Sequence, residues 1–249
     1  MNYISQSNIG AQIFRFEKLT STNEVLREFV ENKSALHGAV VVSNFQTNGR
    51  GQITNTWESE ADKNLLLSIY ITPKTITATE QVLINLFVSL SVFDFLNSFF
   101  PGKIKIKWPN DIYFDDQKIC GILIENNIQG NTIKSSVIGV GININQRNFL
   151  SKQATSLAMI SNMQCDLDEL LDELLSCFNL RFEELSLQLK SKLTDDYLKV
   201  MYRINMEANY RIEDKIVCGK IIGIDAFGRL KLLIGDELKL YSFKEISYE

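Results

Sequence analysis

The sequence predicts an α+β fold with a small β-rich domain at the C-terminal end of the chain. Most of the predicted strands are joined by hairpin turns, a few long helices are set between them, and from about residue 205 short strands alternate with turns. The 249 residues are enough for one large and one small domain. We therefore expect a main domain over residues 1–204 and a small β-barrel-like domain over residues 205–249.

The first third of the chain combines strands with one helix and one long loop. Alternation predicts a strand over 13–16, a β-branched run predicts a buried strand over 39–42, and a third strand follows over 65–71. Ser21 and Glu24 have the spacing of a capping box that opens a helix. Residues 46–63 show no hydrophobic periodicity and are too many for an ordinary connection, which indicates a functional loop.

The middle of the chain begins with a long helix. Residues 80–100 are apolar nearly all round, so this helix is expected to pack beneath the sheet. Short strands are predicted over 104–107, 112–114, 119–125 and 133–140. Asp115-Asp116 and Gly130-Asn131 are expected to form hairpin turns. Two more helices are predicted, over 166–189 and 194–202.

Composition excludes several classes of protein. The chain has 26 Lys and Arg against 30 Asp and Glu, a net charge of −4, which argues against a protein whose main task is to grip nucleic acid. No two of its four cysteines form a C-x-x-C pair, so the sequence supports neither a zinc site nor a disulfide framework. The first residues do not form a signal peptide, and no apolar run approaches the ~20 residues that span a bilayer. We expect a cytoplasmic protein without a membrane partner.

Two of the polar motifs lie on predicted loops or turns. In Gln46-Thr47-Asn48-Gly49-Arg50-Gly51-Gln52, glycines let the backbone approach a ligand and the arginine offers forked donors for a carboxylate or phosphate. In Lys107-Trp108-Pro109-Asn110-Asp111, proline fixes a corner that presents two short polar side chains. Each motif alone is also compatible with an ordinary surface turn.

Two further motifs lie on predicted strands. Lys118 precedes an apolar strand and suits a phosphoryl group or a carboxylate at a pocket edge, although a lysine on an edge strand can equally reach solvent. Gly139-Val140-Gly141-Ile142-Asn143 ends another strand, and Asn143 can hydrogen-bond an adenine edge. The third glycine and the helix of a dinucleotide fingerprint are missing there.

Taken together, the order of these motifs resembles the biotin protein ligase family. The matching set is Ser21-Thr22-Asn23, Gln46 with Gly49-Arg50-Gly51, Trp108-Pro109-Asn110-Asp111, Lys118 with Gly121-Ile122-Leu123, and Gly139-x-Gly141-x-Asn143. The resemblance covers residues 15–160 strongly, and the tail is similar to the family's SH3-like C-terminal domain. It implies a mixed sheet like that of class II synthetases and biotin–lipoate ligases.

The resemblance implies an activity. The protein would make biotinyl-5′-AMP from biotin and ATP, with Mg²⁺ entering on the phosphates near Asp111, and then transfer biotin to a lysine of a carboxylase's biotin carboxyl carrier domain. Lys118 and Arg50 would be the catalytic residues. The implied biotin-binding residues are Ser21, Thr22, Asn23, Gln46, Gly49, Arg50, Gly51, Gln52, Lys118 and Gly121. The implied ATP- and adenylate-binding residues are Trp57, Asn110, Asp111, Lys118 and Asn143.

Two departures from the family pattern and two alternatives bear on this reading. Gln52 stands where some members have an arginine that helps to retain the adenylate, and only ~20 residues precede Ser21, too few for a DNA-binding domain. We therefore expect a ligase that is not a repressor and that holds its adenylate less tightly. A lipoate protein ligase shares the fold and the lysine-centred chemistry, and a nucleic-acid-binding module on the C-terminal barrel is the non-enzymatic alternative. The sequence leaves open whether two copies form a homodimer.

Overall fold

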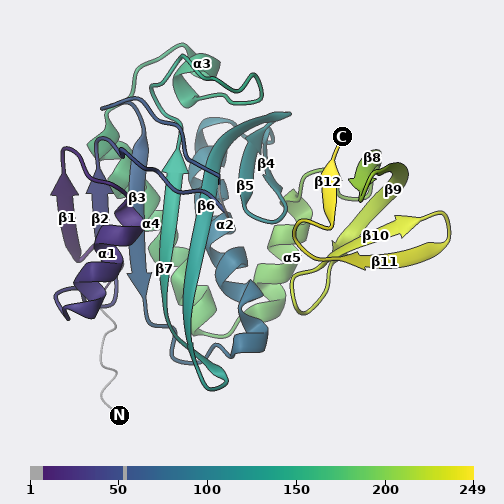
Figure 1. The fold of residues 1–249 in the computed structure, drawn as a ribbon, viewed down its shortest axis with the longest axis horizontal. Helices are drawn as coiled ribbons and strands as arrows, with labels where there is room; N and C mark the ends of the chain where they lie inside the picture. Colours follow the sequence, from purple (N-terminus) through teal and green to yellow (C-terminus); the bar gives the residue numbers. More distant parts are fainter. Residues whose placement is uncertain (1–7, 53–54) are drawn as a thin grey trace.

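The computed structural model describes residues 8–52 and 55–249, which form two sheets and the helices that cover the larger one (Figure 1). The strands of the larger sheet are β1 (Gln12–Phe16), β2 (Ala39–Ser43), β3 (Leu65–Ile71), β4 (Ile104–Lys107), β5 (Asp111–Phe114), β6 (Gln117–Gln129) and β7 (Thr132–Ile142). The helices are α1 (Thr22–Glu31), α2 (Val82–Phe99), α3 (Leu157–Ser161), α4 (Leu167–Ser186) and α5 (Lys190–Val200), with a 3₁₀ turn η1 over Ala78–Glu80.

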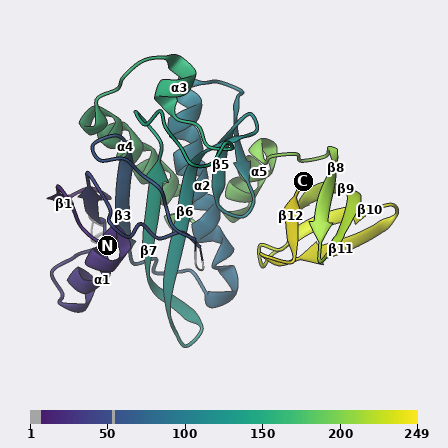
Figure 2. The same ribbon diagram turned by 45° about the horizontal axis from the view of Figure 1, so that its top comes forward.

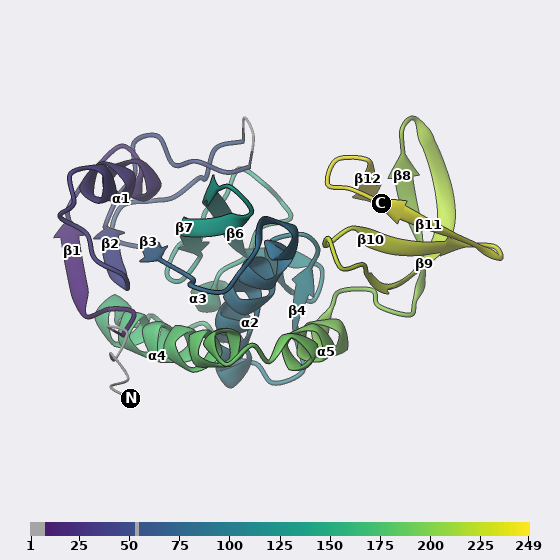
Figure 3. The same ribbon diagram turned by 90° about the horizontal axis from the view of Figure 1, so that it is seen from below.

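The larger sheet is mixed. Its strand order is β1-β2-β3-β7-β6-β5-β4, in which β1 and β2 are parallel and the remaining neighbours are antiparallel. Helix α1 lies on one face of the sheet, and α2, α4 and α5 form a layer on the other face (Figure 3). This arrangement confirms the predicted α+β fold and excludes a doubly wound parallel sheet.

Helix α2 is the central core helix. Eleven of its residues are buried, and the ring of Phe87 packs edge-on against Phe178 and Phe182 of α4, with ring centroids 5.7 and 5.6 Å apart. The stretch Ala78–Phe99 is long and apolar enough to cross a membrane, so the expectation that no apolar run approaches that length was wrong. Within the protein 61% of its apolar window is buried, because the sheet and α4 cover the helix on opposite sides.

The start of α1 differs from the prediction. Ser21 is the N-cap residue, as expected, but its side chain makes no capping hydrogen bond, so the capping box does not form. Instead, the Thr22 backbone N–H donates to Oε1 of Gln46, at 2.8 Å. A side chain from a loop 24 residues further along thus satisfies this helix end, and local sequence spacing could not reveal it.

The C-terminal part of the chain forms a five-stranded antiparallel sheet in the order β11-β10-β9-β8-β12 (Figure 2). Its strands are β8 (Glu207–Ile212), β9 (Lys215–Ile224), β10 (Leu230–Ile234), β11 (Glu237–Tyr241) and β12 (Ile246–Tyr248). Buried residues of this sheet, including Ile221 and Leu230, belong to the same apolar cluster as the main core. The indole N–H of Trp108 also donates to the Gly228 carbonyl, at 2.9 Å. The second sheet is therefore packed against the main domain.

A cluster of charges joins the three helices behind the sheet. Arg181 of α4 is only 13% exposed and donates to Asp94 of α2, to Glu184 of α4 and to Asp196 of α5, at 2.6 to 3.1 Å. Burial raises the pKa of Asp196, but hydrogen bonds from Lys192 and Arg181 outweigh that effect and hold it below its usual range. One guanidinium thus balances three carboxylates from three helices.

Replacing Arg181 with leucine should destabilise the protein, because three carboxylates would remain together without the central cation. We expect a loss of about 3–5 kcal/mol in the free energy of unfolding, measured by urea denaturation. Wild-type stability should also fall as the pH drops through the lowered pKa of Asp196, since a carboxyl with a depressed folded-state pKa contributes only while it is ionised. A variant as stable as wild type at neutral pH would contradict this role for Arg181.

Candidate active site

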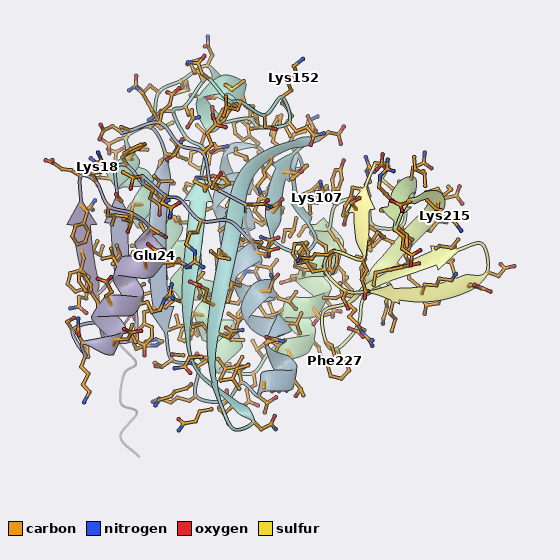
Figure 4. The ribbon with its side chains drawn as sticks, viewed as in Figure 1. Lys18, Glu24, Lys107, Lys152, Lys215 and Phe227 are labelled. Carbon is orange, nitrogen blue, oxygen red and sulfur yellow. The ribbon has the colours of Figure 1, made fainter. Side chains whose placement is uncertain are left out.

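A cavity of about 310 Å³ lies above the centre of the main sheet, between the loop that follows β2 and the C-terminal sheet. Among the described residues that line it, three are cationic, Arg50, Lys107 and Lys118, whereas Asp111 is the single carboxylate. Figure 4 shows Lys107 between the main sheet and the C-terminal sheet. The excess of positive charge suits a ligand with carboxylate or phosphate groups.

The floor of the cavity is the Trp57 indole, which lies on a pair of glycines in adjacent strands. The register of the sheet places Gly121 of β6 directly opposite Gly141 of β7, and the indole of Trp57 lies against both. A Cβ atom would come within 2.7 Å of the ring at Gly121 and within 2.5 Å at Gly141. Only glycine at these two positions lets the indole lie so close to the sheet.

The loop that carries Trp57 folds back on itself. The backbone N–H of Trp57 donates to the Gly49 carbonyl at 2.8 Å, and the backbone N–H of Gly51 donates to the Asn55 carbonyl at 2.7 Å. A Cβ atom on Gly49 would lie 2.6 Å from the Trp57 carbonyl, so this glycine permits the return of the loop, while its own atoms do not line the cavity. Arg50, Gly51, Gln52 and Trp57 do line it.

Of the polar atoms on this loop that are buried without a hydrogen-bond partner among the described residues, two belong to residues that line the cavity. They are the indole nitrogen of Trp57 and Oε1 of Gln52. Buried polar atoms are nearly always satisfied in native proteins. Because both residues line the cavity, we read these atoms as groups that a bound ligand or ordered water would satisfy.

The predicted residues at the start of α1 form one hydrogen-bonded network at one end of the cavity. Oγ of Ser68, a buried residue of β3, lies 2.7 Å from Oγ1 of Thr22 and 2.5 Å from Oδ1 of Asn23. Thr22 also donates from its hydroxyl to Oε1 of Gln46, at 3.1 Å. Ser21, Thr22, Asn23 and Gln46 therefore all line this end of the cavity, and Ser68 beneath them holds Thr22 and Asn23.

Glu125 of β6 joins this network to the arginine loop, and the sequence analysis missed it. Its carboxylate accepts a hydrogen bond from Nδ2 of Asn23 at 2.8 Å and pairs with Arg50 at 3.3 Å. The guanidinium of Arg27, in α1, lies 3.8 Å from the same carboxylate. A glutamate facing the polar side of the predicted strand was the only sequence signal, and it did not indicate that two arginines would converge there.

Lys118 and Asp111 meet at the other side of the cavity. The lysine ammonium lies 2.7 Å from the aspartate carboxylate and 5.5 Å from the centre of a ring of Trp57. The backbone of Lys118 is held by a neighbouring loop, because its N–H donates to Gln153 and its carbonyl accepts from Thr155. Lys118 therefore does not simply reach solvent from an edge strand. Its ammonium is paired with the Asp111 carboxylate within the cavity.

Lys107 is a third cation that the sequence motif contained but to which we had assigned no role. Its ammonium donates to the Tyr113 hydroxyl at 2.8 Å and lies 4.4 and 4.9 Å from the rings of Tyr113 and Tyr248. Burial lowers the pKa of Lys107, Asp111 opposes this shift, and Lys118 adds to it. The positive charge is thus held mainly by aromatic faces, which leaves it available to an incoming anion.

Asn143, like Gly49, is a predicted site residue that does not line the cavity. Its side chain is buried at the end of β7 and donates to the Thr155 carbonyl at 2.9 Å, while Oδ1 has no partner among the described residues. It holds the loop over residues 146–156 against the sheet. Glu58 ties the other long loop to the same place, because its carboxylate accepts from the Leu150 N–H at 3.1 Å. The two long loops beside the cavity are therefore connected.

The C-terminal sheet supplies one wall of the cavity, which the sequence did not indicate. Phe243, Ile246, Ser247 and Tyr248 line it opposite the strands of the main sheet. The ring of Tyr248 also packs against Tyr202, with centroids 5.9 Å apart. These residues lie at the end of the chain, more than 180 residues from Trp57, so only the packing of the two sheets brings them to the site.

The residues present do not form a metal centre by themselves. Within 8–52 and 55–249, no three His, Cys, Asp or Glu side chains come together as ligands for a metal ion. Asp111 is the one carboxylate on the cavity wall, and Lys118 already pairs with it. This donor set fits a Mg²⁺ ion that is carried mostly by substrate phosphates and touches one carboxylate.

Comparison with known proteins agrees with this geometry. The sequence model of the biotin/lipoate A/B protein ligase family matches residues 15–143, more than half of the chain. The chain belongs to this family. The matched region contains the end of β1, all of β2 to β7 and every predicted site residue, so it includes the whole of the cavity lining except the residues of the C-terminal sheet.

Relatives extend the likeness over nearly the whole chain. Biotin–protein ligase 2 of Arabidopsis thaliana is 30% identical over 258 residues, which covers 97% of this chain and 75% of that protein. The bifunctional ligase/repressor BirA of Bacillus subtilis is 28% identical over 242 residues, covering 94% and 73%. The solved structure of the biotin protein ligase from Aquifex aeolicus in complex with biotin and ATP superimposes with a TM-score of 0.80 at 25% identity, covering 96% of this chain and 99% of that one.

Replacing Gly141 with alanine should displace the Trp57 indole, because the added methyl group would lie 2.5 Å from the ring. We expect a loss of about 1–3 kcal/mol in stability and a change in tryptophan fluorescence. The matched control is the same glycine substitution in a Trp57→Ala background, where the clash is absent and the cost should nearly disappear. An equal loss in both backgrounds would show that Trp57 does not lie on this glycine.

Proposed function

We propose that this protein activates biotin with ATP to form biotinyl-5′-AMP and pyrophosphate, and then transfers the biotin to a lysine of a biotin carboxyl carrier domain. The observation that carries the proposal is the single cavity in which Arg50, Lys107 and Lys118 converge beside a hydrogen-bonding end and an indole floor. Family membership and the likeness to a ligase solved with biotin and ATP support it.

The chemistry explains why three cations are needed. A carboxylate oxygen of biotin attacks the α-phosphorus of ATP, a new P–O bond forms, and the bond to the β-phosphate oxygen breaks to release pyrophosphate. Both reactants are anions, and negative charge builds up on the α-phosphate and the leaving group. Arg50 and Lys118 would hold the carboxylate and the α-phosphate, and Lys107 would hold the terminal phosphates, as preorganised charges. Mg²⁺ bound to the phosphates, near Asp111, would neutralise further charge.

Neutral parts of the substrates would occupy the two ends of the cavity. Ser21, Thr22, Asn23 and Gln46 offer paired donors and acceptors at the start of α1, which suit the ureido ring of biotin. The Trp57 indole offers a flat face for adenine, and its buried N–H is a donor that still lacks a partner among the described residues. Asn143 would act at the adenine side through the loop that it holds.

Biotin-dependent exchange of labelled pyrophosphate into ATP tests the proposal. Wild-type protein should catalyse exchange with biotin, whereas Lys118→Ala should be slower by about 100-fold or more, because a preorganised charge on the transferring phosphate is lost. Lipoate is the parallel acid. Exchange with lipoate in place of biotin would assign the chain to the lipoate branch of its family, and no exchange with either acid would refute the proposed activation.

Gln52→Arg should make the protein hold its adenylate longer. The substitution adds a cation to a loop position that lines the cavity, and a hydrogen bond to a charged group is worth about 1.5–3 kcal/mol, which slows release about 10- to 100-fold. The measurement is the dissociation rate of labelled biotinyl-5′-AMP, with Gln52→Met as the uncharged control. If wild type and Gln52→Arg release the adenylate at the same rate, Gln52 does not limit retention.

A further inference from the structure

A second cleft of about 320 Å³ lies beside the active-site cavity. Its walls come from the start of α2, from β6, from Tyr197 of α5 and from loops of the C-terminal sheet. Figure 4 labels Phe227 at the lower edge of the C-terminal sheet, on the side facing the main domain. Gln81, Asn85 and Ile124 line this cleft but not the cavity.

The cleft and the cavity are neighbours that share a wall. The six residues that line both are Gln52, Trp108, Pro109, Asn110, Ile122 and Phe243. Gln52 lies on the same loop as Arg50, and Asn110 is adjacent in sequence to Asp111. A group that enters through the cleft would therefore arrive beside the cations that hold the reacting carboxylate.

The chemistry of the cleft differs sharply from that of the cavity. None of the described residues that line it carries a charge, and four are aromatic: Trp108, Tyr197, Phe227 and Phe243. Phe227 is 61% exposed and Phe243 is 43% exposed. Exposed aromatic side chains beside an uncharged hollow are typical of a surface that binds a partner.

We propose that this cleft receives the acceptor lysine of the carrier protein together with the main chain around it. The assignment rests on the proposed function, which requires a protein lysine to reach the biotinyl carbonyl. Because the cleft adjoins the cavity, a lysine bound in it would lie next to that carbonyl, and the apolar lining suits the four methylene groups of its side chain.

The transfer step explains why an uncharged cleft would favour the reaction. The neutral lysine amine attacks the carbonyl carbon of the mixed anhydride, a C–N bond forms, and the C–O bond to phosphate breaks to release AMP, while the amine loses a proton to solvent. Lysine enters as an ammonium ion, which cannot attack. An apolar cleft without carboxylates would lower the pKa of a lysine once the carrier covers it, and the three cations in the adjoining cavity would lower it further. A negatively charged cleft would instead hold the ammonium form.

Asn85→Trp should separate the two half-reactions, because it fills the cleft from α2 without touching the cavity. Biotin-dependent pyrophosphate exchange should remain at the wild-type rate, whereas transfer to a purified biotin carboxyl carrier domain should fall about 100-fold. Hydroxylamine, which is small and does not need the cleft, should still release biotin hydroxamate at the wild-type rate. Gln81→Lys, at an exposed position on the same rim, should raise the KM for the carrier by repelling the incoming ammonium.

The matched control is Asn127→Trp. Asn127 is exposed on β6 next to Asn126, which lines the cleft, but its side chain points to the opposite face of the strand and lines neither space. This control should transfer biotin as wild type does. Wild-type transfer by both Asn85→Trp and Gln81→Lys would overturn the assignment of the cleft. Failure of the wild type to catalyse biotin-dependent exchange would instead refute the proposed function, and the cleft's role with it.

Discussion

The ion pair between Lys118 and Asp111 is the contact on which the order of the cavity depends. Three cations share a space of about 310 Å³, and without counter-charges they would repel one another across a partly desolvated site. Asp111 fixes Lys118 at 2.7 Å, Glu125 holds Arg50 at 3.3 Å, and two tyrosine rings surround Lys107. Each cation is therefore held in place, yet enough positive charge remains uncompensated to bind two anionic substrates.

The sheet sets the shape of the space that these charges enclose. Antiparallel pairing of β6 with β7 places Gly121 opposite Gly141, and two residues further along it places Leu123 opposite Gly139. The first pair accommodates the Trp57 indole, and Gly139 leaves room for the amide of Asn23, whose Oδ1 would lie 2.4 Å from a Cβ atom there. Three glycines on two neighbouring strands thus allow an aromatic floor and a polar recognition end to lie directly on the backbone.

Sequence patterns predicted the elements that local chemistry determines. The strand Leu65–Ile71 was predicted with its observed bounds, and the loop after β2, predicted from its length and lack of periodicity, does supply residues to the cavity lining. Strand β6 proved longer than predicted, because its polar end continues to pair with β7 beyond Glu125. Ser68 and Glu125 could not be predicted as site residues, since each is an ordinary polar residue on a strand until α1 and the arginine loop are packed against it.

The contribution of the C-terminal sheet was also beyond the reach of sequence reasoning. The chain's last strand brings Tyr248 to Lys107, and the loop before it brings Phe243 to Pro109, although no motif connects these positions. As a result, the cavity and the neighbouring cleft both lie between the two sheets. The two-step reaction that we propose would need two approaches to the same carbonyl, and the packing of the small sheet against the main domain places two hollows side by side.

The most direct test of this account is a crystal structure of the protein with biotin and a non-hydrolysable ATP analogue bound together. The ureido ring is expected to lie against Asn23 and Gln46, and the biotin carboxylate is expected to meet the α-phosphate between Arg50 and Lys118. Biotin bound away from the start of α1, or a carboxylate that does not face these two cations, would contradict the claim that one cavity brings both anions together.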